Sequence, residues 1–312
     1  MAESGRDELV VVAAWLHYAD GLTHEAIAKK LNISRVKVTR LLQRARAEAV
    51  VQFKITRPLP MQFDLERRLQ SELRIPRAVV VRTLPTLDET REELGKRGAD
   101  HVRGLLVRDC RLGVGWSTTV SHIAHHFEAP RPPVTCIVTE LVGGYPGHTN
   151  PYSISAQIAQ RLAAPLETLP VPAFVQSPEA RDAILTEGVI RSVLDHARKC
   201  DIALVGLGDV SSGGTMIKTG FVTEDEMAEL RRQGAVGDVL GRFYDVGGRR
   251  VDTPLDARCI SIAWEDILRI PHIVVLALGA SKVEPILGAI RGGFCHSLIT
   301  DTDTARTLLE SP

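Results

Sequence analysis

The sequence predicts an α/β protein in two parts, a helix-turn-helix domain over residues 1–57 and a doubly wound parallel-sheet domain over residues 58–312. Three observations predict this fold class. The first 57 residues carry apolar side chains mainly at helical spacing, interrupted by tight turns. From about residue 77 onward, apolar runs of strand length alternate with helical segments, which is typical of a sheet covered on both faces. Between the two parts, Pro58-Leu59-Pro60 indicates a stiff linker.

Three helices are predicted in the N-terminal part. Apolar residues at helical spacing place the first over about residues 7–18. Thr23 is of the residue type that caps helices and opens a short second helix, and Ser34 caps a third helix that runs to about Ala47. Two short helices joined by so brief a turn indicate a helix-turn-helix. Residues 50–55 alternate enough to predict a strand, as a small wing.

The formal charge of the whole chain is zero, which would argue against a nucleic-acid partner if the charge were evenly spread. It is not, because residues 1–57 hold ten basic and six acidic side chains, and the remainder holds 28 and 32. Residues 29–46 contain seven basic side chains and no acidic one. An ordinary solvated helix face usually mixes both signs, so this asymmetry favours DNA binding by the basic part.

The size of the DNA grooves assigns roles within this motif. The major groove admits one α-helix, and the N-terminal residues of the second helix of the motif reach the base edges. Basic residues elsewhere on the motif contact phosphates, which position the protein without specifying sequence. The predicted DNA-binding residues are Ser34, Arg35, Lys37 and Val38 for bases, Lys30, Arg40 and Arg44 for phosphates, and Thr23 at the start of the preceding helix.

The larger part is predicted to alternate strands with helices after a charged helix near residues 63–73 that suits packing or dimerisation. Its predicted strands span residues 78–81, 112–114, 135–141, 202–207, 260–263, 273–278 and 297–299. Its predicted helices lie near residues 88–107, 118–127, 152–163, 178–197, 224–232, 283–291 and 303–309.

Ligands of doubly wound domains bind at the carboxyl ends of the strands, where glycine-rich turns lead into helices. Three turns have this character: Gly113 to Thr119, Gly206 to Asp209, and Leu278 to Lys282. None matches a dinucleotide or nucleoside-triphosphate fingerprint. Small residues and hydroxyls before a helix leave backbone N–H groups free for a phosphate, and Lys282 adds an ammonium group. Together they predict an anionic ligand, although each glycine alone is equally compatible with tight packing.

Over essentially the whole chain, the sequence resembles the SorC family of sugar-responsive bacterial transcriptional regulators. The segment from Ile27 to Leu42 resembles the family's DNA-binding segment, and Gly113 to Val120 resembles its effector loop. Further matching blocks, in the right order, are Gly143-Gly144, Asp201 to Gly208, Gly234 to Asp238, Gly279 to Lys282 and Thr300-Asp301.

This resemblance implies a Rossmann-like effector domain related to sugar-phosphate isomerases, a phosphorylated sugar as inducer, and tetramers built from dimers. It also implies a repressor or other regulator of a carbohydrate operon. Thr118 and Thr119 would hold the phosphate, Lys218 and Lys282 would add positive charge, and Asp238 would accept hydroxyl groups. The full set of implied effector-binding residues is Gly115, Ser117, Thr118, Thr119, Gly143, Gly144, Lys218, Asp238 and Lys282.

Three positions depart from the family pattern. Ser117 stands where the family often has glycine, and Ala280 replaces the second glycine of a Gly-Gly-x-x-Lys turn. Val142 precedes Gly143-Gly144 where some members carry a basic residue, which argues against a doubly phosphorylated effector. A monophosphate, a sugar alcohol or another polar metabolite all remain open.

Two other functions compete with that of a regulator. An isomerase or deaminase with an accessory helix-turn-helix would need a convergent acid/base pair, for which Asp238 and Glu265 are the candidates. A ligand-free oligomeric scaffold is the other rival. Trp116 suits either stacking on a sugar ring or simple packing. The sequence favours a regulator that is not an enzyme.

No cofactor or metal is expected. His122, His125 and His126 include a pair at helical i, i+4 spacing, but no third ligand follows from the sequence. The five cysteines are scattered and form no Cys-x-x-Cys, which predicts buried thiols in a reducing compartment. The acidic N-terminus and the absence of long apolar runs predict a cytoplasmic protein without a membrane span.

Overall fold

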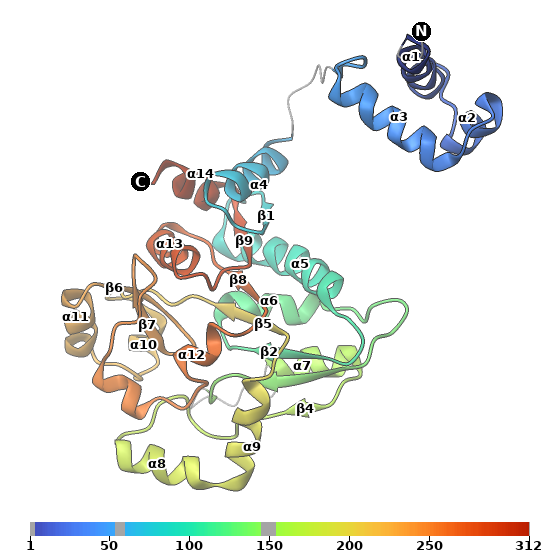
Figure 1. Ribbon diagram of the computed structural model, residues 1–312. Helices are drawn as coiled ribbons and strands as arrows, with labels where there is room; N and C mark the ends of the chain where they lie inside the picture. Colours follow the sequence, from blue (N-terminus) through green and yellow to red (C-terminus); the bar gives the residue numbers. More distant parts are fainter. Residues whose placement is uncertain (1–3, 54–59, 145–153, 312) are drawn as a thin grey trace. The chain divides into compact units, whose positions relative to one another are not determined.

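The computed structural model describes residues 4–53, 60–144 and 154–311 (Figure 1). The chain divides into two compact units, residues 1–59 and 60–312. Each unit has its own hydrophobic core. Most of the predicted linker, Pro58-Leu59, lies outside the described residues. Within the described residues, no helix is both long enough and apolar enough to cross a bilayer.

Three helices form the N-terminal unit: α1 (Ser4–Tyr18), α2 (His24–Leu31) and α3 (Arg35–Ala47). They confirm the predicted helix-turn-helix. Both predicted caps are present, because Thr23 Oγ1 accepts the Ala26 N–H at 3.2 Å and Ser34 Oγ accepts the Lys37 N–H at 3.2 Å. Asn32 adopts the left-handed conformation (φ 51°) that ends α2 and turns the chain toward α3.

The wing predicted after α3 is wrong for the described part of that segment, since residues 50–53 form no strand. Side-chain packing explains the apolar pattern instead. Val51 packs against the cluster of Val10, Ala14 and Ala45. The Phe53 ring meets the Tyr18 ring edge to face at a centroid distance of 5.1 Å. Residues 54 and 55 lie outside the described part.

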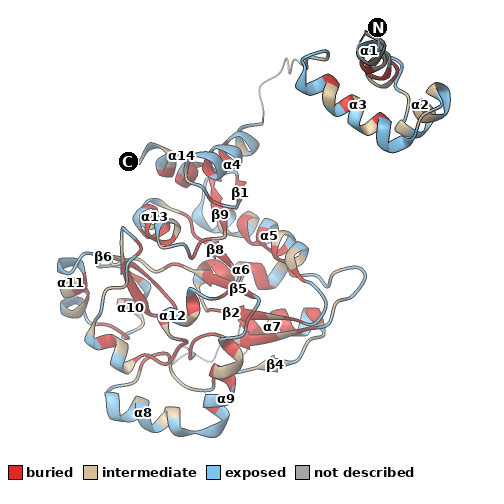
Figure 2. Ribbon diagram, viewed as in Figure 1, coloured by how far each residue is buried: buried red, intermediate tan, exposed pale blue. Residues whose placement is uncertain are grey.

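Seven strands form the central sheet of the larger unit: β1 (Arg77–Val81), β2 (Cys110–Val114), β3 (Cys136–Glu140), β4 (Leu166–Glu167), β5 (Ile202–Gly206), β8 (His272–Leu276) and β9 (Ser297–Asp301). Their order is β1-β9-β8-β5-β2-β3-β4, and every neighbouring pair is parallel. The predicted parallel sheet is therefore confirmed. Its strands are apolar and buried because helices cover both faces (Figure 2).

The helices of this unit are α4 (Met61–Glu72), α5 (Leu87–Leu105), α6 (Thr118–His126), α7 (Ile154–Leu162), α8 (Pro178–Thr186), α9 (Gly188–Ala197), α10 (Thr215–Lys218), α11 (Glu224–Arg232), α12 (Trp264–Ile267), α13 (Val283–Arg291) and α14 (Thr302–Glu310), with 3₁₀ turns η1 (Pro254–Arg258) and η2 (Ala280–Lys282). Buried residues of α5, α6 and α7 share one core with the sheet. Those of α4, α9, α13 and α14 belong to the other core. The sheet is thus doubly wound.

Two predicted elements of the larger unit differ from the structure. The predicted strand 260–263 makes only an isolated antiparallel bridge, between Ser261 and Val142. The single helix predicted over 178–197 is two helices, because Glu187 is extended (ψ 124°) and separates α8 from α9. A hairpin of β6 (Ala235–Val239) and β7 (Arg242–Asp245) was not predicted. Leu240 and Gly241 turn it with positive φ, and the leucine gives no turn signal in the sequence.

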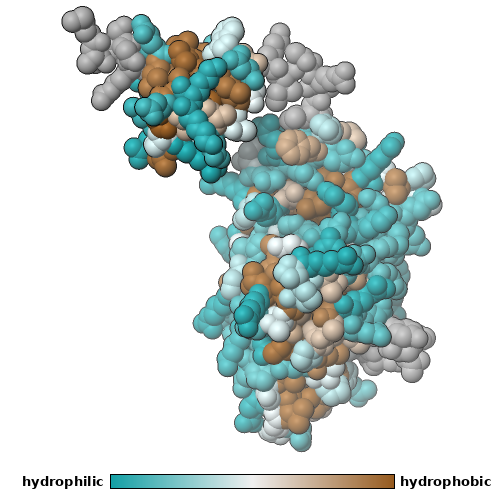
Figure 3. All heavy atoms as spheres, turned by 90° about the vertical axis from the view of Figure 1, so that its right-hand side faces the viewer, coloured by the Kyte–Doolittle hydropathy of each residue, from teal (hydrophilic) through white to brown (hydrophobic). Residues whose placement is uncertain are grey.

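On the face that Figure 3 shows, hydrophilic residues are interspersed with apolar ones in both units. On α1, Val11, Val12 and Trp15 are exposed. All five cysteines are free and buried, as the sequence predicts.

Candidate functional site

The strand order predicts a ligand-binding crevice at the carboxyl ends of the central strands β2 and β5. After β2 the chain proceeds to β3 on one side, and after β5 it proceeds to β8 on the other, so β2 and β5 flank the point where the winding reverses. In doubly wound folds, ligands bind outside the carboxyl ends of the strands at this point. The turns after β2, β5 and β8 are the three glycine-rich turns singled out in the sequence.

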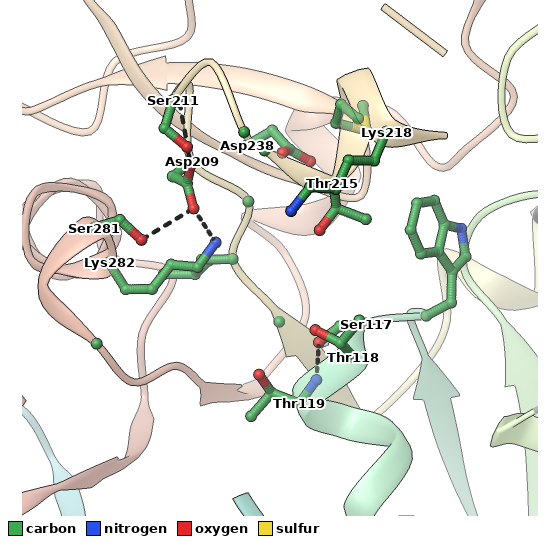
Figure 4. Close-up of a pocket in the computed structure, with 18 of the residues that line it drawn as sticks. Ser117, Thr118, Thr119, Asp209, Ser211, Thr215, Lys218, Asp238, Ser281 and Lys282 are labelled. Atoms are coloured by element: carbon green, nitrogen blue, oxygen red, sulfur yellow. Dashed lines mark hydrogen bonds and ion pairs between the residues drawn. The ribbon is translucent and has the colours of Figure 1, made fainter. Parts of the chain in front are cut away.

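These turns surround a cavity of approximately 330 Å³. Six of the predicted effector-binding residues line it: Ser117, Thr118, Thr119, Lys218, Asp238 and Lys282 (Figure 4). The structure therefore brings together residues that are up to 165 positions apart between Ser117 and Lys282. Figure 4 shows Ser117, Thr118 and Thr119 on one side, with Asp238 and Lys218 facing them and Asp209 with Lys282 beside them.

Three predicted effector-binding glycines do not line the cavity, and two of them, Gly115 and Gly143, are tightly packed against other residues. A side chain on Gly115 would lie 2.5 Å from Leu240 Cδ2, and one on Gly143 would lie 2.6 Å from the Pro172 carbonyl oxygen. Gly144 is hydrogen-bonded to the backbone of Val171 at 2.7 Å.

The N-terminus of α6 forms one wall of the cavity. Ser117 is its N-cap, and Ser117 Oγ accepts the N–H groups of Thr119 and Val120 at 3.1 and 3.2 Å. The first N–H groups of a helix have no intrahelical carbonyl partner, so Thr118 N–H is left for a ligand. The hydroxyl groups of Thr118 and Thr119 add donors beside it. This wall can hold an oxyanion.

Asp209 ends the predicted Gly206 to Asp209 turn and lines the cavity, although sequence reasoning gave its side chain no role there. Its carboxylate accepts a hydrogen bond from Lys282 Nζ at 2.7 Å, one from Ser281 Oγ at 3.2 Å, and one from Ser211 Oγ. Burial acts to raise the pKa of Asp209, but the bonds from Lys282 and Ser211 outweigh it and lower the pKa to about 2. Lys282 therefore faces the cavity as one half of an ion pair.

Asp238 is buried in the opposite wall. Gly241 N–H donates to its Oδ2 at 3.0 Å, while burial raises the pKa of Asp238 to about 6. Gly208 packs so closely that a side chain there would lie 1.7 Å from Asp238 Oδ1. An Asp in this environment is a hydrogen-bond acceptor at neutral pH and suits a hydroxyl-bearing ligand.

Lys218 and Trp116 also line the cavity and add a cation and an aromatic ring to its walls. Lys218, at the end of α10, extends into the cavity (Figure 4), and no ion pair to it occurs within the described part of the chain. Trp116 donates its indole N–H to the Gly143 carbonyl at 3.0 Å and lies 5.8 Å from Phe221, ring centre to ring centre. Trp116 therefore packs and lines the cavity at once.

The helix-turn-helix presents most of its predicted DNA-binding residues to solvent. The exposed ones are Thr23, Lys30, Ser34, Arg35, Lys37 and Arg40. The prediction that Val38 contacts a base is wrong. Val38 is fully buried among Ala13, Leu16, Ile27 and Leu42, so it cannot reach a base edge.

Arg44 is already engaged within the N-terminal unit. Its guanidinium pairs with both Asp7 and Glu48 at 2.6 Å. Arg40, one turn earlier on α3, makes no ion pair with the described residues.

Comparison with known proteins agrees with both units. Residues 57–310 match the family model described as "Putative sugar-binding domain", and residues 15–48 match "Sigma-70, region 4". The chain belongs to the SorC family of bacterial transcriptional regulators. Its relatives include the erythritol catabolism regulatory protein EryD of Brucella abortus, 30% identical over 98% of both chains. The sorbitol operon regulator of Klebsiella pneumoniae is 28% identical over 99% of this chain and all of its own.

A solved structure supports the same assignment. The full-length sorbitol operon regulator SorC from Klebsiella pneumoniae superposes with a TM-score of 0.76 at 28% identity, covering 97% of this chain and 98% of that one. The deoxyribonucleoside regulator of Bacillus subtilis is 29% identical over 97% of this chain and 98% of its own.

Two positions that depart from the SorC-family pattern have clear structural roles. Ser117 supplies the α6 cap described above. Val142 is buried at the cavity wall and pairs with Ser261 in an antiparallel bridge. The cavity wall is apolar at this position.

The acid/base pair needed by an enzyme does not converge within the described residues of this SorC-family chain. Glu265 does not line the cavity; its side chain is 60% exposed and lies 3.6 Å from Arg250. Two of the three histidines singled out in the sequence face α5 instead: Glu92 accepts a hydrogen bond from His126 at 2.5 Å and its carboxylate lies 3.3 Å from His122 Nδ1. Within the described residues, no group of three or more His, Cys, Asp or Glu is arranged to hold a metal.

Proposed function

We propose that this SorC-family chain is a DNA-binding transcriptional regulator of a carbohydrate catabolic operon, gated by a phosphorylated sugar or related polyol. Residues 1–57 bind the operator, and residues 58–312 bind the effector and form the oligomer. The observation that carries the proposal is the cavity at the switch point of the sheet, with hydroxyls and cations on its walls, in a chain that also has an exposed basic helix-turn-helix. Relatives named for erythritol, sorbitol and deoxyribonucleosides support a polyhydroxylated effector.

Different walls of the cavity bind different groups of the effector. Thr118 and Thr119 at the start of α6 hold the phosphate, and Lys218 supplies a positive charge that no described carboxylate neutralises. Asp238 accepts hydrogen bonds from hydroxyl groups of the ligand. Lys282 is held by Asp209 at 2.7 Å, so an anion reaching Lys282 competes with Asp209 for it.

The exposed residues of the helix-turn-helix read the operator. Ser34, Arg35 and Lys37 lie at the start of α3, the position that enters the major groove. Lys30 and Arg40 contact phosphates. A dimer places two such helices on a palindromic operator, and dimers assemble further into a tetramer.

Gating requires that the effector bind one assembly more tightly than the other. A ligand of equal affinity for the DNA-competent and incompetent states shifts nothing. No turnover and no cofactor are needed for this role, and the protein acts in the cytoplasm, where its operator DNA is found.

Electrophoretic mobility shift with the upstream DNA of its own gene tests the proposal. We expect a complex that weakens with salt, with log K falling by about 0.9 per phosphate contacted per log unit of salt. A sugar phosphate from a panel of pentose and hexose phosphates should change its apparent affinity. Lys218→Gln should abolish that response, whereas Lys199→Gln, an exposed lysine outside the cavity, should retain it. A complex absent at every protein concentration would defeat the proposal.

A further inference from the structure

Arg91 reaches the effector cavity from a helix that sequence reasoning did not connect with ligand binding. Because β1 and β2 belong to one parallel sheet, α5 and α6, which follow them, both begin at the carboxyl edge. The two helices touch where Gly95 packs on the His122 backbone, so closely that a side chain on Gly95 would lie 2.6 Å from it. Arg91 is one turn before Gly95, and Thr118 is one turn before His122. Arg91 and Thr118 accordingly line the same cavity.

The guanidinium of Arg91 is incompletely partnered. Its Nε is buried and has no hydrogen-bond acceptor among the described residues. Its Nη1 makes one long contact, 3.4 Å to Asp88 Oδ1, and the Asp88 side chain is 86% exposed. Exposed pairs of this kind contribute little. A buried polar atom without a partner needs a structural explanation, because nearly all such atoms in proteins are satisfied.

Position within the cavity distinguishes this atom from the other unsatisfied ones. Four buried side-chain atoms lack partners in the described part of the chain, and Arg91 Nε is the one whose residue lines the cavity. Lys282, by contrast, is satisfied by Asp209 at 2.7 Å. Among the described residues, two lining cations therefore keep unused donors, Lys218 on α10 and Arg91 on α5, and of these Arg91 lies on the helix that packs against α6.

We propose that Arg91 binds the effector directly, donating from its guanidinium to a terminal anionic group that Thr118 and Thr119 contact from the other helix. A phosphate monoester and a carboxylate share this chemistry, and both accept two parallel N–H bonds from an arginine fork. The polyhydroxyl end of the ligand then points toward Asp238, across the cavity in Figure 4. This inference rests on the proposed function and names the residue that selects an anionic effector over a neutral one.

Three ligands with the same six-carbon chain test it: sorbitol 6-phosphate, gluconate and sorbitol, titrated calorimetrically into the full-length protein. Arg91→Gln is compared with Arg97→Gln, an exposed arginine on the same helix outside the cavity. Loss of charge-assisted hydrogen bonds predicts about 10- to 100-fold weaker binding of the anionic ligand by Arg91→Gln. Binding of sorbitol should change by less than about 3-fold, and Arg97→Gln should match wild type for all three. The more weakened of the two anions identifies the group that Arg91 selects.

Equal affinities of Arg91→Gln and Arg97→Gln for every anionic probe would overturn the inference and leave the proposed function standing. Wild-type protein that binds none of the three, nor inorganic phosphate at millimolar concentration, would overturn both. If Arg91→Gln does not fold, Arg91→Lys is measured instead, since lysine keeps the charge and the aliphatic stem but cannot form the fork. It should lose about 3-fold or more in affinity for the anion alone, and no loss would overturn the inference.

Discussion

Replacing Gly208 by Ala should disrupt the wall of the cavity that holds Asp238. The backbone of Gly208 has an ordinary negative φ, so alanine brings no conformational strain, and the perturbation is steric. The added methyl group would lie 1.7 Å from Asp238 Oδ1, a distance that no real contact allows. The carboxylate must therefore move, and with it the 3.0 Å hydrogen bond from Gly241 N–H.

Two terms set the size of the effect. Overpacking of a filled interior costs about 1–3 kcal/mol, and loss of a hydrogen bond to a charged group costs about 1.5–3 kcal/mol. The sum predicts a loss of roughly 2.5–6 kcal/mol in the free energy of unfolding. For a domain of this size, roughly 2–4 °C in Tm accompanies each kcal/mol, so Tm should fall by roughly 5–24 °C.

Gly213→Ala is the matched control. Gly213 lines the same cavity, but nothing lies within 4 Å of a side chain built there, and its φ is not positive. Thermal unfolding of both variants by circular dichroism measures the difference. Calorimetric titration with sorbitol should show weaker binding by Gly208→Ala alone, since Asp238 is displaced. A Gly208→Ala protein that melts within about 1 °C of Gly213→Ala would refute the steric argument.

Three further predictions concern titration and DNA contacts. Burial raises the pKa of Asp238 from 3.8 to about 6, so its ionisation destabilises the fold as pH rises from 4 to above 6. Urea unfolding should therefore show the free energy of unfolding of Asp238→Asn rising by about 2 kcal/mol relative to that of wild type as the pH increases from about 4.5 to 7.5. Parallel pH profiles of the free energy of unfolding for the two proteins would contradict this. Burial, with smaller contributions from nearby cations, lowers the pKa of His101 from 6.5 to about 4, so stability present above pH 6.5 is lost as pH falls toward 4. Between pH 7.5 and 5 in the same assay, the free energy of unfolding of His101→Gln should fall by about 1 kcal/mol less than that of wild type, after discounting for the partial exposure of His101. An equal fall in both proteins would contradict the lowered pKa of His101. On α3, Arg40→Gln should reduce the salt slope of operator binding by about 0.9 in a mobility-shift titration. Arg44→Gln should change that slope less, because the wild-type Arg44 side chain is held by two ion pairs at 2.6 Å. Equal losses of slope in the two variants would show that these ion pairs open on DNA.

Local sequence signals predicted the elements that local physics controls. The hydroxyls of Thr23 and Ser34 cap α2 and α3 through N–H groups three residues further on, and such a bond needs no information from the rest of the chain. Apolar runs likewise predicted six strands of the parallel sheet. The prediction failed where a contact with a distant part of the chain, or an unusual backbone conformation, determined the structure. Residues 260–263 meet Val142 at only one bridge, and Leu240 adopts a left-handed turn that leucine does not signal.

The candidate site was predicted in part for the same reason. Six of its residues were assigned from glycine-rich turns and the family resemblance, because a turn between strand and helix is a local feature. Arg91 was not predicted, because it reaches the cavity only through the packing of α5 against α6. Asp209 lies in a predicted turn, but its pairing with Lys282 depends on the meeting of the loops after β5 and β8.

By itself, the sequence determined that a basic helix-turn-helix precedes a doubly wound α/β domain, since charge, periodicity and capping act over a few residues. Only the tertiary structure decided which side chains meet. It paired Lys282 with Asp209 across 73 positions, buried Val38 in the helical core, and separated Glu265 from the cavity that holds Asp238. The order of strands in the sheet fixes these neighbours, and that order follows from how the apolar faces of all the elements pack together.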